Sequence, residues 1–466
     1  MKRKVLILLL FCLIAGIWKN TSVFAEEVPM IYAYINDSVL TIKPSGNSSA
    51  EAFLELLRDG DVTIEMHDYG NFEKVGPIGS TLPRNDEPIT TEPGDVILYL
   101  GTEITIYYDV NNWTFTRLGK VQGLTQAELR QILGSGNVSA RFSLTPPETN
   151  TDSFMNQETI TTSGGFTIEK SALPYLTDDA SAPVVYYLSD ISAEGLMKAY
   201  AALGVELPGK VGVKMSTGES TRSNYLRPAL IADLIHSVNG TIVECNTAYG
   251  GNRASTARHR QQAKDNGLLD IAELDILDEE GSMELPVEGG NVLSVDYVGT
   301  HFVNYDSYLV LSHFKGHAMA GFGGAIKNIS IGFGSAQGKG WIHSGGTSMT
   351  SIWGGKQDAF LEAMADAAKA VDTFMGDNIV YINVLNRLSV DCDCDGNPAE
   401  PDMHDIAILA SADPLAIDQA AIDLVYAMPD SRSLVNRIES RNGLHTLEAG
   451  AQNGLGSRNY RLVVVE

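Results

Sequence analysis

Short apolar segments alternate with amphipathic helices from Val184 onward, and this alternation restricts the fold of the 466-residue chain more than any other feature. The expected strands cover residues 184–188, 211–215, 241–245, 308–312 and 379–384, and the expected helices cover 194–203, 227–238, 256–266, 359–375 and 416–428. Such alternation is typical of βαβ units, which build a largely parallel sheet with helices on both faces. We therefore expect an α/β domain over residues 183–466, with ligands bound at the carboxyl ends of its strands.

Residues 28–145 follow a different pattern, in which short β-branched and aromatic runs are separated by turn signals. The expected strands are 30–35, 39–42, 62–66, 96–100, 104–108 and 113–118, and two helices are expected at 49–58 and 125–134. Many short strands with few helices favour a small closed or nearly closed β-barrel. The polar, proline-rich sequence that begins at Thr145 then indicates a linker, which we assign to residues 146–182.

The first 25 residues are typical of an export signal peptide. Lys2, Arg3 and Lys4 precede an apolar run over residues 5–18, and a cleavage site follows at Ala25. The apolar run is short for a membrane-spanning helix. We therefore expect an exported protein (secreted, cell-surface or periplasmic) that is cleaved after Ala25 and does not stay inserted in the membrane.

The charge of the chain limits its partners. The sequence contains 33 basic and 58 acidic residues, which gives a net charge of −25. A protein surface of this charge repels phosphate backbones, which excludes nucleic acid as a general partner. The same charge favours cationic ligands or metal ions, so we expect the partner to be a small molecule or a metal.

A glycine-rich stretch over residues 312–343 concentrates the candidate chemistry of the second domain. Eight glycines between Gly316 and Gly340 are interspersed with ionisable side chains. These side chains are His313, Lys315, His317, Lys327, Lys339 and His343. Because glycine lets a main chain approach a ligand closely, the stretch indicates a binding site. The alternative is a packed connection whose histidines only form hydrogen bonds.

Histidine and lysine suggest different roles within this stretch. His313, His317 and His343 are candidate metal ligands, since imidazole binds zinc and related metals. Lys315 and Lys327 are candidate catalytic residues, because a lysine orients an anionic substrate, or transfers protons if burial lowers its pKa. Both lysines are expected in loops that follow strand ends.

A third group of polar residues follows strands nearer the start of the second domain. Asn246, Arg253 and His259 are candidates for binding an anion where two glycines precede an expected helix, and Lys214, at the end of another expected strand, is a further ligand-binding candidate. A simple strand-to-helix connection fits the same residues. Lys339 is a further ligand-binding candidate, but its Gly-Ser-Ala-Gln-Gly-Lys sequence is one residue short of a phosphate-binding loop, which excludes a nucleotide site of that kind.

Removal of the signal leaves three cysteines, and this odd number argues against a structural disulfide framework. Cys392 and Cys394, with His404 close behind, offer soft ligands for a transition metal such as zinc, iron or nickel. Three alternatives stay open for this acidic segment. They are a calcium loop that begins at Asp391, a solvated turn with inert thiols, and a reversible disulfide.

Three segments of the first domain carry a family pattern: Tyr69-Gly-Asn-Phe-Glu-Lys-Val-Gly-Pro-Ile-Gly, Leu82-Pro-Arg-Asn-Asp-Glu-Pro and Trp113-Thr-Phe-Thr-Arg-Leu-Gly-Lys. They resemble the bacterial cyclophilin-like domain family, which implies a cyclophilin-type β-barrel. Prolyl isomerases of that fold use an arginine beside an aromatic residue and a glutamine, whereas Arg84 and Arg117 lie in other sequence surroundings. We therefore expect a barrel that binds or supports, without isomerase activity.

The second domain contains the sequences His313-Phe-Lys-Gly-His, Gly321-Phe-Gly-Gly-Ala-Ile-Lys-Asn, Val390-Asp-Cys-Asp-Cys-Asp and Ser440-Arg-Asn-Gly-Leu-His. These resemble the domain of unknown function 362 family. The resemblance implies an α/β domain with an iron–sulfur or other metal-related role, distantly similar in fold to nickel-dependent lactate racemase. Many relatives have a run of four cysteines that this chain lacks, and Phe333 stands where relatives often have a cysteine. The Cys-x-Cys pair is then the one pair of thiols left for a metal.

Together these patterns predict an exported two-domain protein with a metal-dependent or small-ligand site in its α/β domain. The alternative is a non-catalytic extracellular protein that binds a peptide, a metal or a small molecule.

Overall fold

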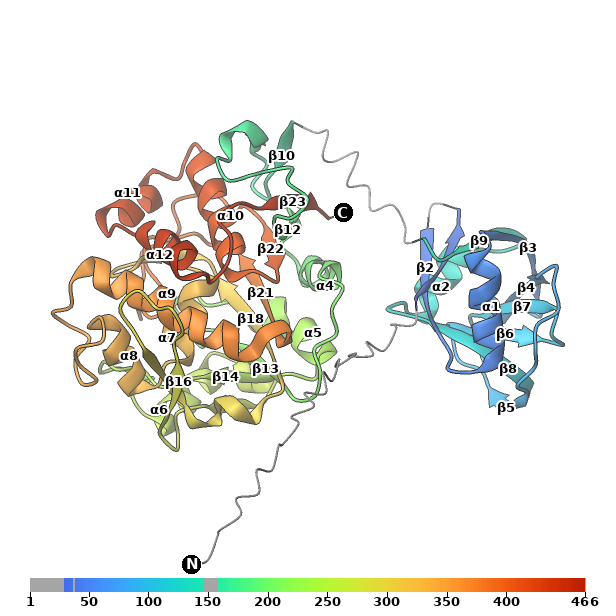
Figure 1. Cartoon of the computed structure of the whole chain (residues 1–466), viewed down its shortest axis with the longest axis horizontal. Coiled ribbons are helices and arrows are strands. Elements are labelled where there is room, and N and C mark those ends of the chain that lie inside the picture. The colour runs from blue at the N-terminus through green and yellow to red at the C-terminus, as the bar shows by residue number, and fades with distance from the viewer. Residues whose placement is uncertain (1–28, 37, 146–157, 466) are drawn as a thin grey trace, which may run out of the picture. The chain divides into compact units, whose positions relative to one another are not determined.

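The computed structural model describes residues 29–36, 38–145 and 158–465. The chain divides into two compact units, with the boundary between Thr149 and Asn150 (Figure 1). The predicted export signal and residues 146–157 of the predicted linker lie outside the described residues. Within the described ranges, every helix is too short or too polar to cross a membrane.

The first unit is a closed antiparallel β-barrel, as the sequence predicts. Its strands run in the order β2-β1-β9-β3-β4-β7-β6-β8, and pairing of β8 with β2 closes the barrel. Their bounds are β1 (Ile31–Ile35), β2 (Ser38–Pro44), β3 (Val62–Tyr69), β4 (Glu73–Pro77), β6 (Asp95–Tyr99), β7 (Glu103–Tyr107), β8 (Asn112–Val121) and β9 (Val138–Ser143). A further strand, β5 (Glu87–Thr90), pairs with β8.

Side chains that alternate along the strands fill the barrel. In β1, Ile31, Ala33 and Ile35 are buried, while the two residues between them are half-buried, which is the period of two expected for a strand. Helices α1 (Ser48–Arg58) and α2 (Gln126–Leu133) add leucines and a phenylalanine to the same core. The sequence did not predict β4, β5 and β9, because their proline, glycine and charged residues interrupt the apolar pattern.

The second unit has a mixed, largely parallel sheet, again as predicted. The strand order is β15-β14-β13-β18-β21-β22-β12-β23, and the first five strands are parallel to one another. β22 is antiparallel to both of its neighbours, and β23 is parallel to β12. The bounds are β12 (Val184–Leu188), β13 (Val211–Lys214), β14 (Thr241–Glu244), β15 (Leu274–Ile276), β18 (Ser307–His313), β21 (Ile379–Val384), β22 (Ile408–Ser411) and β23 (Arg461–Val464).

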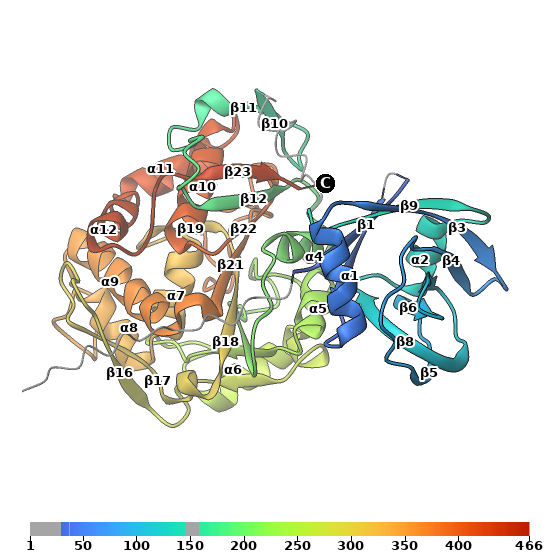
Figure 2. The same cartoon turned by 45° about the vertical axis from the view of Figure 1, so that its right-hand side comes forward.

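Helices cover both faces of this sheet (Figure 2). Helices α4 (Ala193–Ala202), α5 (Pro228–Ser237) and α6 (Thr256–Asp265) pack on one face, against side chains such as Leu309 and Leu311. Helices α7 (Ala325–Phe333), α9 (Gln357–Met375) and α10 (Pro414–Ala427) pack on the other, against Tyr308 and Val310. Residues that alternate along β18 therefore enter two separate cores. The remaining α-helices of the described residues are α8 (Ala336–His343), α11 (Arg432–Ser440) and α12 (His445–Asn453).

Part of the predicted linker folds with the second unit. Strands β10 (Thr159–Thr161) and β11 (Thr167–Glu169) form an antiparallel pair. Ile160, Ile168 and Leu173 of this region are buried in the main core of the second unit. Strands of three residues are too short to give a periodic signal in the sequence.

The glycine-rich stretch folds into a hairpin and two helices, so the loops expected at Lys315 and Lys327 are wrong: Lys315 begins β19, and Lys327 lies in α7. After β18, the hairpin strands β19 (Lys315–His317) and β20 (Gly321–Gly323) lead into α7 and α8. The glycines allow close packing between parts of the chain as well as lining a site. A Cβ atom on Gly338 of α8 would lie 1.9 Å from the carbonyl oxygen of Tyr297, in strand β17 (Val295–Gly299).

Candidate functional site

A cavity of about 660 Å³ opens at the carboxyl ends of the central parallel strands. Lys214 ends β13, Glu244 ends β14 and His313 ends β18, and all three line this cavity. The chain passes from β13 to β14 on one side, whereas β18 lies on the other side of β13. The strand order therefore reverses between β13 and β18, which is where open α/β sheets leave a crevice for a ligand.

Most of the residues that the sequence singles out meet in this cavity. Its wall includes Lys214, Arg253, His313, Lys315, His317, Lys327, Lys339, His343, Cys392 and Cys394. Residues far apart in the sequence are thus brought together, because the loops after parallel strands share one edge of the sheet.

Asn246 and His259 lie behind the wall instead of in it. The Asn246 side chain donates to Asp278 (Nδ2 to Oδ1, 3.1 Å) and so ties two loops together. Nε2 of His259 lies 2.8 Å from the Thr217 hydroxyl and 3.4 Å from Oε2 of Glu244, and this imidazole is fully buried. Both side chains therefore support the loops of the site without facing a ligand.

His404 does not join the cysteines. Its Nδ1 lies 2.7 Å from Oδ2 of Asp430, and its ring packs edge-on against Phe166, with 4.9 Å between the ring centroids. The His404 side chain is 60% exposed and is not part of the cavity wall. A short distance along the chain predicted proximity, but the His404 side chain contacts Asp430 at the surface instead.

The cavity wall is strongly cationic, in contrast to the whole chain. Its six basic side chains are Lys214, Arg253, Lys315, Lys327, Lys339 and Arg441. Its only carboxylates among the described residues are those of Glu244 and Asp393. The net charge of −25 led us to expect cationic ligands, but that charge resides on other parts of the molecule. The cavity instead suits an anion.

The carboxylate of Glu244 is paired with the cationic side chains beside it. Its carboxylate lies 3.2 Å from Nη1 of Arg253 and 3.9 Å from Nζ of Lys214, and it accepts a hydrogen bond from the Thr217 hydroxyl at 2.7 Å. Burial alone would raise the pKa of Glu244, but Arg253 and Lys214 outweigh it and hold the pKa well below its usual range. Arg253 is also paired with Glu219 (3.0 Å from Nε to Oε2). Arg253 therefore has little charge left for a ligand.

The carboxylate of Asp393 is likewise paired with His313 and Lys315. Oδ1 of Asp393 lies 2.7 Å from Nδ1 of His313, and Oδ2 lies 3.1 Å from Nζ of Lys315. The other ring nitrogen of His313 lies 2.7 Å from the Asn386 carbonyl oxygen. Both nitrogens thus contact oxygen atoms of the protein, so neither is open to the metal that the sequence predicts. Burial would raise the pKa of Asp393, but Lys315 and His313 hold it well below its usual range.

Asn328 joins the two strand ends at which the order reverses. Its amide nitrogen donates to the Lys214 carbonyl oxygen at 3.1 Å and to the Ser312 hydroxyl at 3.0 Å. Its amide oxygen accepts from Nζ of Lys214 at 2.9 Å. Burial lowers the pKa of Lys214 to about 8, and the contact with Asn328 adds no negative charge to offset this.

Lys327 and Lys339 line the cavity without a carboxylate partner. Among the described residues, Lys327 forms no hydrogen bond or ion pair, and burial together with Lys315 lowers its pKa to about 7. Lys339 donates to the Gly334 carbonyl oxygen at 2.5 Å. An anionic ligand would balance these two amines and Arg441, which donates to the Ala318 carbonyl oxygen and forms no ion pair among the described residues.

Cys392 and Cys394 form a disulfide, which corrects the expectation drawn from the odd number of cysteines. A turn in which Asp395 N–H donates to the Cys392 carbonyl oxygen (2.9 Å) brings the two Cα atoms to 5.2 Å. That separation lies within the range of about 4.4–6.8 Å usual for disulfides. Cys245 is the free, buried thiol that remains.

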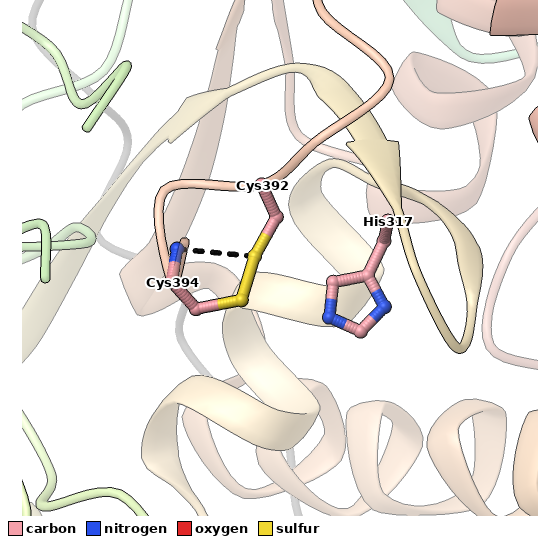
Figure 3. A group of neighbouring side chains, drawn as sticks. All are labelled: His317, Cys392 and Cys394. Carbon is pink, nitrogen blue, oxygen red and sulfur yellow. Dashed lines mark hydrogen bonds between the residues drawn. A yellow bond between two sulfur atoms is a disulfide. The ribbon is translucent and has the colours of Figure 1, made fainter. Parts of the chain in front are cut away.

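His317 lies beside this disulfide, with one ring nitrogen directed toward the sulfur atoms (Figure 3). Within the described part of the chain, His317, Cys392 and Cys394 are the one group of three possible metal ligands, with ligand atoms within 4.8 Å of one another. Nδ1 of His317 accepts hydrogen bonds from the backbone N–H groups of Met319 (3.2 Å) and Ala320 (2.9 Å). Burial and the nearby Lys327 lower the pKa of His317 well below its usual range, so the neutral ring carries its proton on Nε2.

This arrangement does not fit a metal ion. A disulfide offers no thiolate, and the protonated Nε2 of His317 offers no lone pair. The alternative of a calcium loop fails as well, because its carboxylates diverge. Asp393 turns to His313, whereas Asp391 accepts from the Ala399 N–H at 3.0 Å.

His343 is the remaining predicted ligand in the wall. Its Nδ1 lies 2.6 Å from the Lys339 carbonyl oxygen, and its ring stacks on Phe360 with 4.7 Å between centroids. Burial lowers the pKa of His343 to about 4, so the ring is neutral at physiological pH. It donates through Nδ1 and keeps a lone pair on Nε2.

The sequence interpretation missed Glu244, Asn328 and Arg441, which help to hold these groups in place, and it considered Asp393 only as a calcium ligand. Each has a recognisable signal. Glu244 is a carboxylate that directly follows two apolar residues at the end of β14, and Asp393 separates the two cysteines. Asn328 and Arg441 belong to the family sequences quoted above, so the motifs contain supporting residues as well as candidate ligands.

No curated protein matches this chain. Among solved structures, the lactate racemase apoprotein from Thermoanaerobacterium thermosaccharolyticum is similar at 13% identity and a TM-score of 0.32, over 66% of this chain and 87% of that one. A Thermotoga maritima protein is similar at 10% identity and a TM-score of 0.31, over 56% of this chain and 58% of that one. McbB in complex with tryptophan is similar at 17% identity and a TM-score of 0.21, over 24% of this chain and 44% of McbB. With TM-scores this low, we draw nothing about activity from them.

Two family matches agree with the two units. Residues 33–143 match the cyclophilin-like family, and they form the closed barrel. Residues 211–423 match the domain of unknown function (DUF362), and they contain β13, β14, β18 and the loop of the cysteine pair. The chain therefore carries a cyclophilin-like domain followed by a domain of unknown function 362.

Proposed function

We propose that the second unit binds a small anionic molecule, bearing carboxylate or phosphate groups, in its cavity and acts on it as an enzyme. The observation that supports this function is the charge of the cavity wall. Six basic side chains accompany two carboxylates, and both carboxylates are already paired. Lys327 and Lys339 are the amines whose charge remains for a ligand.

The energetics of burial favour such a ligand. Removing an ammonium group from water costs on the order of several kcal/mol unless a partner compensates. A carboxylate or phosphate in the cavity would accept charge-assisted hydrogen bonds, each contributing roughly 1.5–3 kcal/mol. The binding energy thus comes from charges that the free protein leaves unbalanced.

Lys327 is the candidate acid–base group of the reaction. Its pKa of about 7 allows the amine to hold or release a proton near neutral pH. Lys315, the other lysine that the sequence predicts as catalytic, is paired with Asp393 and suits the role of orienting the substrate.

Calorimetric titration of the purified protein tests this function. Succinate, citrate and phosphate represent the proposed ligands, and the dication putrescine represents the opposite class. Lys327→Gln should weaken the preferred anion about 10- to 100-fold, which corresponds to the loss of one charge-assisted hydrogen bond. Lys198→Gln is the matched control, because Lys198 lies on the surface of α4 beside Glu194. Preference for putrescine, or no binding of any anion, would contradict the proposal.

A transition metal such as zinc, iron or nickel is the second candidate, restricted to the reduced protein. The grouping of His317 with the two cysteines supports it, provided that the disulfide opens and Nε2 loses its proton. Elemental analysis after anaerobic reduction tests this candidate. Near-stoichiometric metal that disappears in Cys392→Ser would support it, and a metal-free reduced protein would remove it.

The first unit is proposed to be a binding barrel without isomerase activity. Arg84 contacts Asp86, and Arg117 lies 3.1 Å from Asp95, so both arginines are engaged in ion pairs. A proline-isomerisation assay with a chromogenic peptide should show no acceleration by the protein.

The positive n-region and apolar run before Ala25 support export, and the mature protein should then begin at Glu26 when its N-terminus is sequenced.

A further inference from the structure

We propose that the Cys392–Cys394 disulfide is a redox centre that small anionic thiols reduce inside the cavity. This inference rests on the proposed function, because the same cationic wall would select the thiol. The disulfide and the unbalanced amine of Lys327 line one cavity, so a molecule held by its carboxylates would meet the sulfur atoms.

The two sulfur atoms are not equivalent. The Cys392 residue is 5% exposed, whereas Cys394 is half-buried and therefore the more accessible of the two. The backbone N–H of Cys394 lies 3.1 Å from Sγ of Cys392 and donates to it. Negative charge that develops on Cys392 would be stabilised by this hydrogen bond. Attack is therefore expected at Cys394, with Cys392 as the leaving group.

His317 adds a proton donor on the same side. Its Nδ1 is occupied by two backbone N–H groups, and its other nitrogen faces the disulfide (Figure 3). The Nε2–H group is directed at the sulfur atoms and would donate to the departing one.

The amines lie next to the cysteine loop. A Cβ atom on Gly323 would lie 3.1 Å from Cδ of Lys327 and 3.8 Å from Nζ of Lys315, which places these lysines side by side. Lys315 is in turn 3.1 Å from Asp393, the residue between the two cysteines. An anionic thiol bound by Lys327 is thereby concentrated beside the disulfide, and neutral or cationic thiols lack this attraction.

The reaction balances with two thiols of one kind, written RSH. The first, as a thiolate, forms a bond to Sγ of Cys394 while the Cys392–Cys394 bond breaks, and Cys392 leaves as a thiolate. The second thiolate attacks the sulfur of R in the mixed disulfide, which yields RSSR and releases Cys394. Two electrons pass from the thiols to the protein disulfide, and the two thiol protons end on Cys392 and Cys394.

A purely structural disulfide is the competing account, and the ring size disfavours it. The bridge joins residues two apart in the sequence. A loop this short restricts the unfolded chain very little, so the bond adds little conformational stability.

Reduction rates of the purified, oxidised protein test the inference. The thiols are mercaptosuccinate (anionic), 2-mercaptoethanol (neutral) and cysteamine (cationic), each normalised by its rate with a small neutral disulfide. Alkylation and mass spectrometry report the free thiols of Cys392 and Cys394. We expect mercaptosuccinate to react about tenfold or more faster than the other two after normalisation, as electrostatic concentration allows. Equal normalised rates, or a disulfide inert to all three, would overturn the inference.

Two variants separate this inference from the proposed function. Lys327→Gln should remove the preference for mercaptosuccinate while 2-mercaptoethanol still reduces the disulfide, and Lys198→Gln should keep the preference. The double variant with Cys392→Ser and Cys394→Ser should still bind succinate, which contains no thiol. If the protein binds succinate but its disulfide is inert to all three thiols, only the redox role is rejected and the proposed function stands. Absence of anion binding together with equal rates for all thiols rejects both proposals.

Discussion

The carboxylate of Asp393 lies 2.7 Å from Nδ1 of His313, although 80 residues separate the two in the chain. This contact fastens the cysteine loop to the end of β18, in the interior of the second unit. The same carboxylate balances Lys315, so one side chain fixes two of the groups that line the cavity.

Asp393→Asn should therefore destabilise the second unit by about 3–5 kcal/mol, the usual cost of leaving buried charges without their partner. Urea denaturation at pH 7, followed by tryptophan fluorescence, measures this loss. Glu194→Gln is the control, because its ion pair with Lys198 lies on the surface, and it should change stability by less than about 0.5 kcal/mol.

The low pKa of Asp393 also predicts how stability depends on acid. A carboxyl group whose pKa is lower in the folded state contributes stability above its unfolded pKa, about 3.9, and this contribution is lost as the pH falls through the folded pKa. The wild-type protein should lose stability below about pH 4 more steeply than Asp393→Asn. Parallel curves for the two proteins would show that Asp393 is not ionised in the fold.

Lys327→Met should stabilise the ligand-free protein at pH 7 by at least about 1 kcal/mol, since each unit by which burial lowers a pKa costs about 1.4 kcal/mol while the group is charged. The unfolded chain keeps this proton up to about pH 10.4, whereas the folded chain loses it near a pKa of about 7. Between these values the unfolded state binds more protons, so wild-type stability rises with pH. Urea denaturation at pH 7 and pH 9 should show the advantage of Met shrinking, and a constant difference would contradict this reasoning.

Asn328→Ala should cost about 2–4 kcal/mol, because it leaves polar groups at the ends of β13 and β18 without their partner. Loss of the amide oxygen also frees Nζ of Lys214 toward the cavity. Anion binding per folded molecule should then persist, while the unfolding midpoint falls. Abolished binding in a fully folded variant would instead assign Asn328 to ligand contact.

Gly338→Ala should destabilise the second unit by about 1–3 kcal/mol or more, as overpacking does, because the added methyl group would overlap the Tyr297 carbonyl oxygen. Gly250→Ala is the matched control, since nothing lies within 4 Å of the corresponding methyl position and its backbone is not left-handed. Thermal denaturation of both variants should show a lower midpoint for Gly338→Ala alone.

The long strands and helices of the second unit were predictable, because the apolar residues that they bury form a periodic pattern in the sequence. β18 is buried throughout with an apolar centre at residues 308–311, and α9 presents a long apolar face, so each produces a strong signal. Helices α7 and α8 escaped prediction because glycine lowers helix propensity. Tertiary packing overrides that propensity here, since Asp418 accepts from the N–H groups of Ala325 (2.7 Å) and Ile326 (2.9 Å) and caps α7.

The residues that line the cavity were predictable from the sequence, whereas the positive charge of the cavity was not. Lys214 and His313 follow apolar strands, so the rule for parallel sheets places them at one edge. The partners of these groups depend on long-range contacts such as Asp393 with His313, which leave no local pattern. The net charge is a sum over the whole sequence, so it does not reveal that the residues around the cavity are cationic. The count of cysteines likewise says nothing about a turn that brings two of them together.

The position of β12 has a consequence for how the second unit folds during synthesis. Within the described residues this strand, at Val184–Leu188, pairs only with β22 and β23, which lie more than 200 residues later in the chain. Its sheet edges stay open until those segments emerge, and open edges are prone to pair with other chains. Pairings between such distant segments are also slow to form. A chain halted before β23 would thus contain β22 but leave the other edge of β12 unpaired and available to another chain.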